Sequence, residues 1–171
     1  MVTVITDGTL YLGRNLFGTV SNIKAPDIEP NTLKIKMLGS VGEYSVNLLS
    51  VKEMKCSATL TGYDLKVFEK ISEPTQELTM TIYADIKEYD GARLLSQKPY
   101  ALKIRGTCEK FSMLGELKAQ ENIDYPMDFS CTALKKSVNG REIYEIDIPN
   151  YVYKHKGVDL LAKTKKNLGL T

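Results

Sequence analysis

The chain has 171 residues, a formal net charge of +2, 43% hydrophobic residues and 26% charged residues. This length and composition are ordinary for one globular domain, and so small a charge does not indicate nucleic-acid binding. No stretch approaches the roughly 18 apolar residues of a membrane span, and the N-terminus has no basic, apolar leader. We therefore expect a single soluble domain over residues 1–171, made in the cytosol and without membrane insertion.

The positive charge is concentrated at the C-terminus. Residues 151–171 contain five lysines and one aspartate, a net charge of +4, which leaves a slightly acidic −2 on residues 1–150. Such a cluster is compatible with a solvated helix face and with a local binding surface.

Three cysteines, Cys56, Cys108 and Cys131, lie far apart and are odd in number. No pair has the spacing of zinc ligands, and each cysteine lies in a segment of alternating apolar residues. These features predict buried free thiols in a reducing compartment.

The first 60 residues are predicted to be strands joined by turns. Two prolines make 25–31 an extended connector, and Gly39 and Gly42 predict a flexible, exposed tip over 38–43. Apolar residues alternate with polar ones, which indicates strands, at 9–12, 16–23, 32–37, 44–49 and 51–60. In the last of these strands the residues expected in the core are Met54, Cys56, Ala58 and Leu60.

One internal helix follows. Tyr63, Val67 and Ile71 recur every four residues, and either Thr61 or Asp64 can cap the first turn. The pattern predicts a helix of about ten residues that ends before Ser72-Glu73-Pro74.

Three longer strands are predicted after the helix. Asp90-Gly91 marks a turn, and the weak pattern of 110–123 indicates a loop. The alternating segments are 77–87, 98–108 and 124–136.

The C-terminal segment has the clearest local signals. Asn139-Gly140 favours a hairpin turn, because both residues accept positive φ. Short strands at 144–148 and 151–153 precede a helix over 159–168, capped by Asp159. Because so short a helix is marginal alone, we expect it to pack on the preceding strands, with its lysines outward. The predicted fold is mostly β, an antiparallel sandwich or barrel with one internal and one short C-terminal helix.

Few residues offer catalytic or metal-binding chemistry. The single histidine, His155, is expected in an exposed turn, and no cysteine or glycine pattern matches a metal or phosphate site. Glu145 and Asp147 share a strand face, which makes a hydrolase one hypothesis and a solvent or interface face the alternative. On balance we expect no enzyme: no catalytic residue, no metal and no cofactor.

Ten tyrosines interleaved with lysines raise another hypothesis, a β-barrel module that binds single-stranded nucleic acid or an oligosaccharide. The slightly acidic body of the chain counts against nucleic acid. Tyrosine also suits protein interfaces, and long alternating strands with a projecting loop are typical of a subunit that assembles with copies of itself.

Three short stretches near the C-terminus resemble the end of the major tail tube proteins of contractile-tailed phages and R-type pyocin-like particles. They are Asn139-Gly140-Arg141-Glu142-Ile143-Tyr144-Glu145-Ile146-Asp147, Lys156-Gly157-Val158-Asp159-Leu160-Leu161 and Asn167-Leu168-Gly169-Leu170. Lys156 stands where that family has an asparagine. Residues 43–48 are similar to a loop-and-strand segment of the same family.

The resemblance implies the phage tail tube fold and a structural function. In that family, hexameric rings stack into an inner tube, which lies inside a contractile sheath and conducts DNA or punctures a target envelope. The particle is a virion or a phage tail-like bacteriocin, made in the cytoplasm of the host bacterium. Other partners implied are the tape measure, baseplate and tail-terminator proteins, with DNA in the lumen if the particle carries a genome.

The resemblance also implies residue roles. Two hairpins, at about 32–60 and 77–106, would line the lumen, and a projecting loop at 38–47 would reach the next ring. The residues expected at this inter-ring contact are Gly39, Gly42, Tyr44, Val46 and Asn47. The basic residues expected to face the sheath are Lys163, Lys165 and Lys166.

Overall fold

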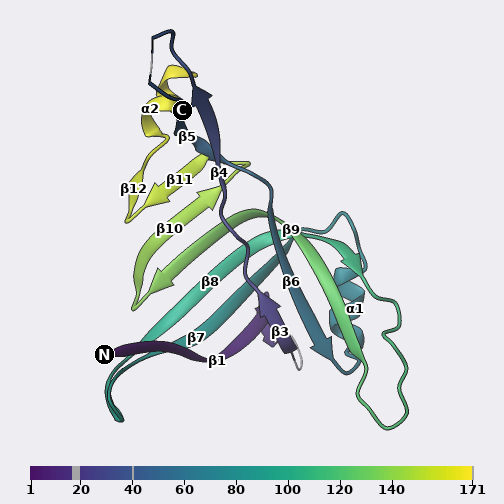
Figure 1. The fold of residues 1–171 in the computed structure, drawn as a ribbon. Helices are drawn as coiled ribbons and strands as arrows, with labels where there is room; N and C mark the ends of the chain where they lie inside the picture. The colour runs from purple at the N-terminus through teal and green to yellow at the C-terminus, as the bar shows by residue number, and fades with distance from the viewer. Residues whose placement is uncertain (17–19, 40, 171) are drawn as a thin grey trace.

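Three long strands form the centre of the molecule: β7 (Leu78–Asp90), β8 (Arg93–Phe111) and β9 (Asp124–Val138). The computed structural model describes residues 1–16, 20–39 and 41–170. Regular alternation keeps each strand extended, because one face can be buried along much of its length. The three strands lie side by side across the middle of the molecule (Figure 1).

On the side of β9 that faces away from β8, the two halves of the strand pair with different strands, so the sheet divides there. Residues 124–131 pair with β6 (Met54–Thr61), whereas residues 133–138 pair with β10 (Arg141–Asp147). In the described chain the result is a ten-stranded antiparallel sheet, with β3 (Val20–Lys24) beside β6. The strands that complete it are β1 (Val2–Leu12), β2 (Asn15–Leu16), β11 (Val152–His155) and β12 (Val158–Asp159).

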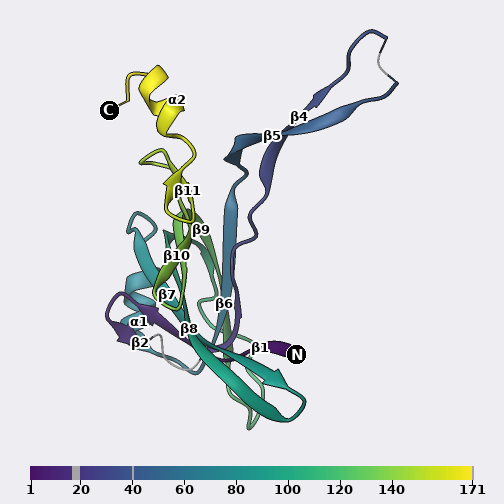
Figure 2. The ribbon, with the colours of Figure 1, turned by 90° about the vertical axis from the view of Figure 1, so that its left-hand side faces the viewer.

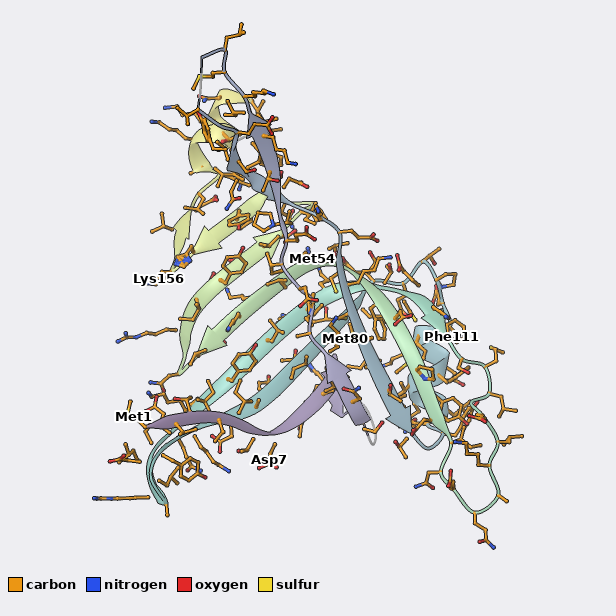
Figure 3. All side chains as sticks on the ribbon, viewed as in Figure 1. Met1, Asp7, Met54, Met80, Phe111 and Lys156 are labelled. Atoms are coloured by element: carbon orange, nitrogen blue, oxygen red, sulfur yellow. The ribbon has the colours of Figure 1, made fainter. Side chains whose placement is uncertain are left out.

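The core consists of alternate residues of these strands. The predicted inward face of β6 is confirmed, since Met54, Cys56, Ala58 and Leu60 are at most 7% exposed. Phe129 of β9 is fully buried against the same cluster. The three cysteines are buried and free, as predicted. Met54 and Met80 lie near the middle of the molecule, and Phe111 lies beside the internal helix (Figure 3).

Gly106 is required where β8 and β9 approach most closely. The register of this pair shifts between Arg105 and Gly106. A Cβ atom at position 106 would lie 2.1 Å from the carbonyl oxygen of Ser130, so a larger residue forces the strands apart.

The internal helix α1 (Leu65–Ile71) begins after Asp64, one of the two caps that the sequence allowed. The Asp64 carboxylate accepts hydrogen bonds from the backbone N–H groups of Lys66, at 3.0 Å, and Val67, at 3.4 Å. The helix has 7 residues and is shorter than predicted, because Tyr63 precedes the cap. Val67 and Ile71 are its buried residues.

Strands β4 (Pro30–Ile35) and β5 (Tyr44–Val51) form a separate two-stranded sheet. We call residues 30–51 the arm, because they extend from the body of the molecule (Figure 2). The loop predicted at 38–47 is therefore too long, since Tyr44, Val46 and Asn47 belong to β5. Ser40, within the predicted loop, lies outside the described residues.

Two strand predictions in the first half of the chain are corrected. The strand predicted over 51–60 is broken at Lys52, whose N–H donates to the carbonyl of Glu29 at 2.8 Å instead of to a ladder. The strand predicted over 16–23 has different partners at its ends, because β2 pairs with β1 and β3 pairs with β6. Residues 17–19 lie outside the described residues.

The C-terminal hairpin is as predicted, but the helix after it is not. Asn139 and Gly140 have φ of 51° and 73°, the turn that this pair favours. Helix α2 spans Ala162–Asn167, shorter than the predicted 159–168, because Asp159 pairs in β12. No residue of α2 itself is buried, and of the stripe expected to pack on the preceding strands only Leu161, which precedes α2, is buried, at 8% exposed.

Candidate assembly surfaces

The arm has one apolar face and one polar face. In the β4–β5 register Leu33 lies opposite Val46 and Ile35 opposite Tyr44, so these four side chains share a face. Leu33 is 54% exposed, Tyr44 51% and Val46 39%. The other face carries Thr32, Lys34, Ser45 and Asn47. An isolated two-stranded sheet is marginally stable, so this exposed apolar face is a candidate surface for contact with another molecule.

The tip of the arm is also apolar. Leu38 and Val41 are fully exposed, and the Lys36 ammonium lies 3.4 Å from the Glu43 carboxylate below them. Gly39 has φ of 84°, a conformation that glycine adopts without strain. The five residues predicted for an inter-ring contact therefore all lie on the arm, but Tyr44 and Val46 face one way and Asn47 the other.

The three lysines predicted as a single basic face of α2 are not equivalent. Lys163 and Lys166 are exposed, whereas the ammonium of Lys165 lies 3.4 Å from the Asp159 carboxylate. Asp159 also accepts a hydrogen bond from the Leu161 N–H at 3.0 Å. Desolvation opposes ionisation of Asp159, but the Leu161 N–H and the Lys165 charge outweigh it and lower the pKa of this carboxyl.

The face that carries Glu145 and Asp147 is a set of ion pairs. Arg105 lies 2.9 Å from Asp147 and 3.2 Å from Glu77, and Lys154 lies 3.1 Å from Glu145. Desolvation opposes ionisation of Asp147, but hydrogen bonds from Asn150 and the charge of Arg105 lower the pKa of this carboxyl. These ion pairs link β10 to β8 and to β11, so the geometry favours a structural role for this face.

The tyrosines do not form a continuous surface for stacking bases. Their ring contacts fall in separate places, with Tyr11 against Tyr83 at 5.6 Å and Tyr144 against Tyr153 at 5.5 Å between centroids. A third group surrounds Phe68 of α1. A single-strand binding face needs successive rings along one groove, and this distribution does not provide it.

His155 ends β11 instead of lying in a turn, and its ring centroid is 6.4 Å from that of Tyr144. In the part of the chain that the structure describes, no group of three or more histidine, cysteine or carboxylate residues could hold a metal ion. No described helix is both long and apolar enough to cross a bilayer.

A second apolar surface was missed by the sequence prediction. Residues 112–123 form a loop, as predicted, but its apolar side chains point outward. Together with the start of α1 they form what we call the lower patch. Its members and exposed fractions are Tyr63 (59%), Leu65 (57%), Met113 (73%), Leu114 (59%) and Leu117 (69%). The apolar run Met113-Leu114-Gly115-Glu116-Leu117 was the available signal, and without a strand or helix period it indicated only a loop.

Comparison with known proteins decides the family. Residues 3–169 match the family model described as phage tail tube protein FII. The chain belongs to this family. The resemblance seen in the C-terminal motifs is thereby confirmed, and the protein is a structural component of the tail tube of a phage or phage tail-like particle.

The match to a curated tail tube protein is local. A segment of 56 residues is 36% identical to the tail tube protein of Escherichia phage P2, and it spans 33% of each of the two chains. The family model, by contrast, covers nearly all of the present chain.

Several solved structures have folds similar to that of this chain. The chain is similar to a protein of the sheath–tube complex of an extracellular contractile injection system, PVC, in its extended state, with TM-score 0.58, 9% identity, and coverage of 76% of this chain and 87% of that one. The sheath/tube terminator of the same system gives TM-score 0.57 and 8% identity, covering 76% and 92%. The tube-terminating cap of the anti-feeding prophage gives 0.56 and 8%, covering 76% and 87%. The predicted fold class is confirmed.

Proposed function

We propose that this tail tube protein forms hexameric rings, and that the rings stack into the inner tube of a contractile phage tail or phage tail-like particle. The observation that carries the proposal is the arm. Its apolar face and tip are exposed in a single chain, and contact with another copy of the chain can bury them.

Ring formation is supported by an open sheet edge. One side of β1 pairs with β7 over most of its length, but on the other side only Tyr11 and Leu12 pair, with β2, among the described residues. The backbone of residues 2–10 can therefore accept a strand from a neighbouring copy. Such pairing extends the sheet that contains the hairpin near 77–106 into the neighbouring copy, so that a wall forms around a lumen without a free edge there.

Outside the tube we assign Lys163 and Lys166 to contact with an acidic surface of the sheath. Lys165 has a different role, because its ammonium already pairs with Asp159 within the chain. A structural subunit needs no catalytic centre. We place tape measure, baseplate and terminator proteins at the ends of the tube. DNA passes through the lumen if the particle carries a genome.

The arm assignment predicts which substitutions prevent stacking. The double variant Leu33→Asp, Val46→Asp puts charge on the apolar face, so rings should form but tubes should not. The matched control, Thr32→Asp, Ser45→Asp, changes the opposite face of the same two strands and should still give tubes. Negative-stain electron microscopy of the purified proteins distinguishes rings from tubes.

Two outcomes would contradict the proposal. Tubes of normal length from the Leu33→Asp, Val46→Asp variant would remove the arm from the inter-ring contact. A wild-type protein that stays monomeric under all assembly conditions would exclude self-assembly as its function.

A further inference from the structure

The arm and the lower patch lie at opposite ends of the molecule. Figures 1 and 2 are related by a rotation about the vertical, and in both views the arm and α2 are at the top. The loop of residues 112–123 and the turn between β7 and β8 are at the bottom in both views. A protein with unlike apolar surfaces at its two ends can associate head to tail, and such association repeats along a line.

The lower patch has a fixed backbone beneath it. The loop is held at its ends, because the Ser112 N–H donates to the carbonyl of Pro126 at 3.3 Å and the Gly62 N–H to that of Ile123 at 3.0 Å. Gly115 packs so closely that a Cβ atom would lie 2.2 Å from the carbonyl oxygen of Asp124. These contacts hold the apolar side chains outward at a defined place.

Aromatic packing supports the side of the patch formed by α1. The ring of Tyr63 lies 5.5 Å from Phe68 and 6.0 Å from Tyr125, and Phe68 contacts Phe111 at 5.6 Å. Phe111 is the last residue of β8 before the loop, so this cluster joins the helix, the central sheet and the loop. An exposed apolar patch with a packed aromatic base is suited to a protein contact.

The two ends also have complementary charge. The arm contains Lys34, Lys36 and Glu43, and the loop contains Glu116, Lys118 and Glu121. Lys36 pairs with Glu43, and Lys118 lies 3.7 Å from Glu116. Among the described residues Lys34 and Glu121 form no ion pair in their own chain, so a surplus cation at the top can meet a surplus anion at the bottom.

From these observations we infer that the lower patch receives the tip of the arm from a second copy of this chain in the adjacent ring. Leu38 and Val41 of one copy contact Met113, Leu114 and Leu117 of the next, and Lys34 approaches Glu121. The inference rests on the proposed stacking of rings, and it adds the surface on which each arm ends.

Disulfide trapping tests this contact directly. The native cysteines are buried, so they leave the surface free for introduced thiols. The variant Val41→Cys, Leu117→Cys places one thiol at the tip and one on the loop of each chain. Mild oxidation of its assembled tubes should produce a ladder of covalent oligomers on a non-reducing gel, and both single variants should remain monomeric. A control pair, Val41→Cys with Arg93→Cys at the β7–β8 turn, should give no ladder.

A second measurement uses charge instead of cross-linking. Leu114→Asp, Leu117→Asp should abolish tubes and leave rings, whereas Leu168→Asp, at the residue that follows α2, should leave tubes intact. Leu168 is a matched control, since it is 58% exposed and Leu114 is 59% exposed. Thermal unfolding of each variant verifies that the domain still folds.

The possible failures are distinguishable. Normal tubes from the Leu114→Asp, Leu117→Asp variant, or tubes of the cysteine pair that give no ladder, would overturn the contact while leaving stacking intact. Dimers from Val41→Cys alone would show that two tips meet each other, which also overturns it. Wild-type protein that forms neither rings nor tubes would refute the proposed function together with this contact.

Discussion

The arm and the central sheet have the same alternation of apolar and polar residues, but they differ in what covers the apolar face. In β6 the alternate residues Met54 to Leu60 are buried by the chain's own strands. In the arm, Leu33, Tyr44 and Val46 alternate in the same way and remain exposed. Alternation therefore shows that a strand has an apolar face, and the partner of that face can be another molecule.

The largest difference between the two regions should appear on truncating an aromatic side chain. Phe129→Ala leaves a cavity in the core and should lower the free energy of unfolding by about 3–5 kcal/mol. Tyr44→Ala removes an exposed ring and should change it by less than about 0.5 kcal/mol. Urea unfolding of the unassembled protein measures both. Equal losses would mean that the arm packs on its own domain.

A second test concerns the backbone of the central sheet. Gly106→Ala brings a methyl group against the Ser130 carbonyl and should cost about 1–3 kcal/mol of stability. Gly8→Ala is the matched control, because its Cβ would lie 3.6 Å from the carbonyl oxygen of Tyr83, an ordinary contact. Thermal unfolding of the two variants measures the difference. If both variants unfold at the same temperature, the close approach of β8 and β9 does not restrict the size of the residue at position 106.

The limits of prediction from the sequence follow from the same comparison. The strands of the centre, the buried cysteines, the Asp64 cap and the Asn139-Gly140 turn were predictable, because each depends on residues close in sequence. The separation of β4 and β5 from the main sheet was not predictable. It arises because β9 pairs with β6 and not with the arm, and this pairing joins residues that are distant in sequence. The patch on the loop at 112–123 was also missed, since exposure depends on which surfaces remain after folding.

Helix capping gives an effect of intermediate size. Asp64→Ala removes the acceptor for two N–H groups at the start of α1 and should cost about 1 kcal/mol, as N-cap substitutions typically do. Asp64→Asn retains an acceptor and should restore most of that loss. Because Val67 and Ile71 anchor α1 in the core, urea unfolding of the whole domain reports the change. Equal stability of wild type and Asp64→Ala would show that packing alone positions the helix.

The smallest effect is expected at the periphery, where α2 lacks a buried side. The folded-state pKa of Asp159 is lowered, so its ionised form stabilises the junction of β12 and α2. This contribution is complete above the unfolded-state pKa of about 3.9 and is lost as pH falls through the lower, folded-state pKa. Amide hydrogen exchange at Leu161 should accelerate relative to a core amide such as that of Phe129 as the pH falls through this range. Asp159→Asn should remove the pH dependence and leave the core unchanged, whereas a wild-type ratio that is constant with pH would show that α2 is held by other contacts.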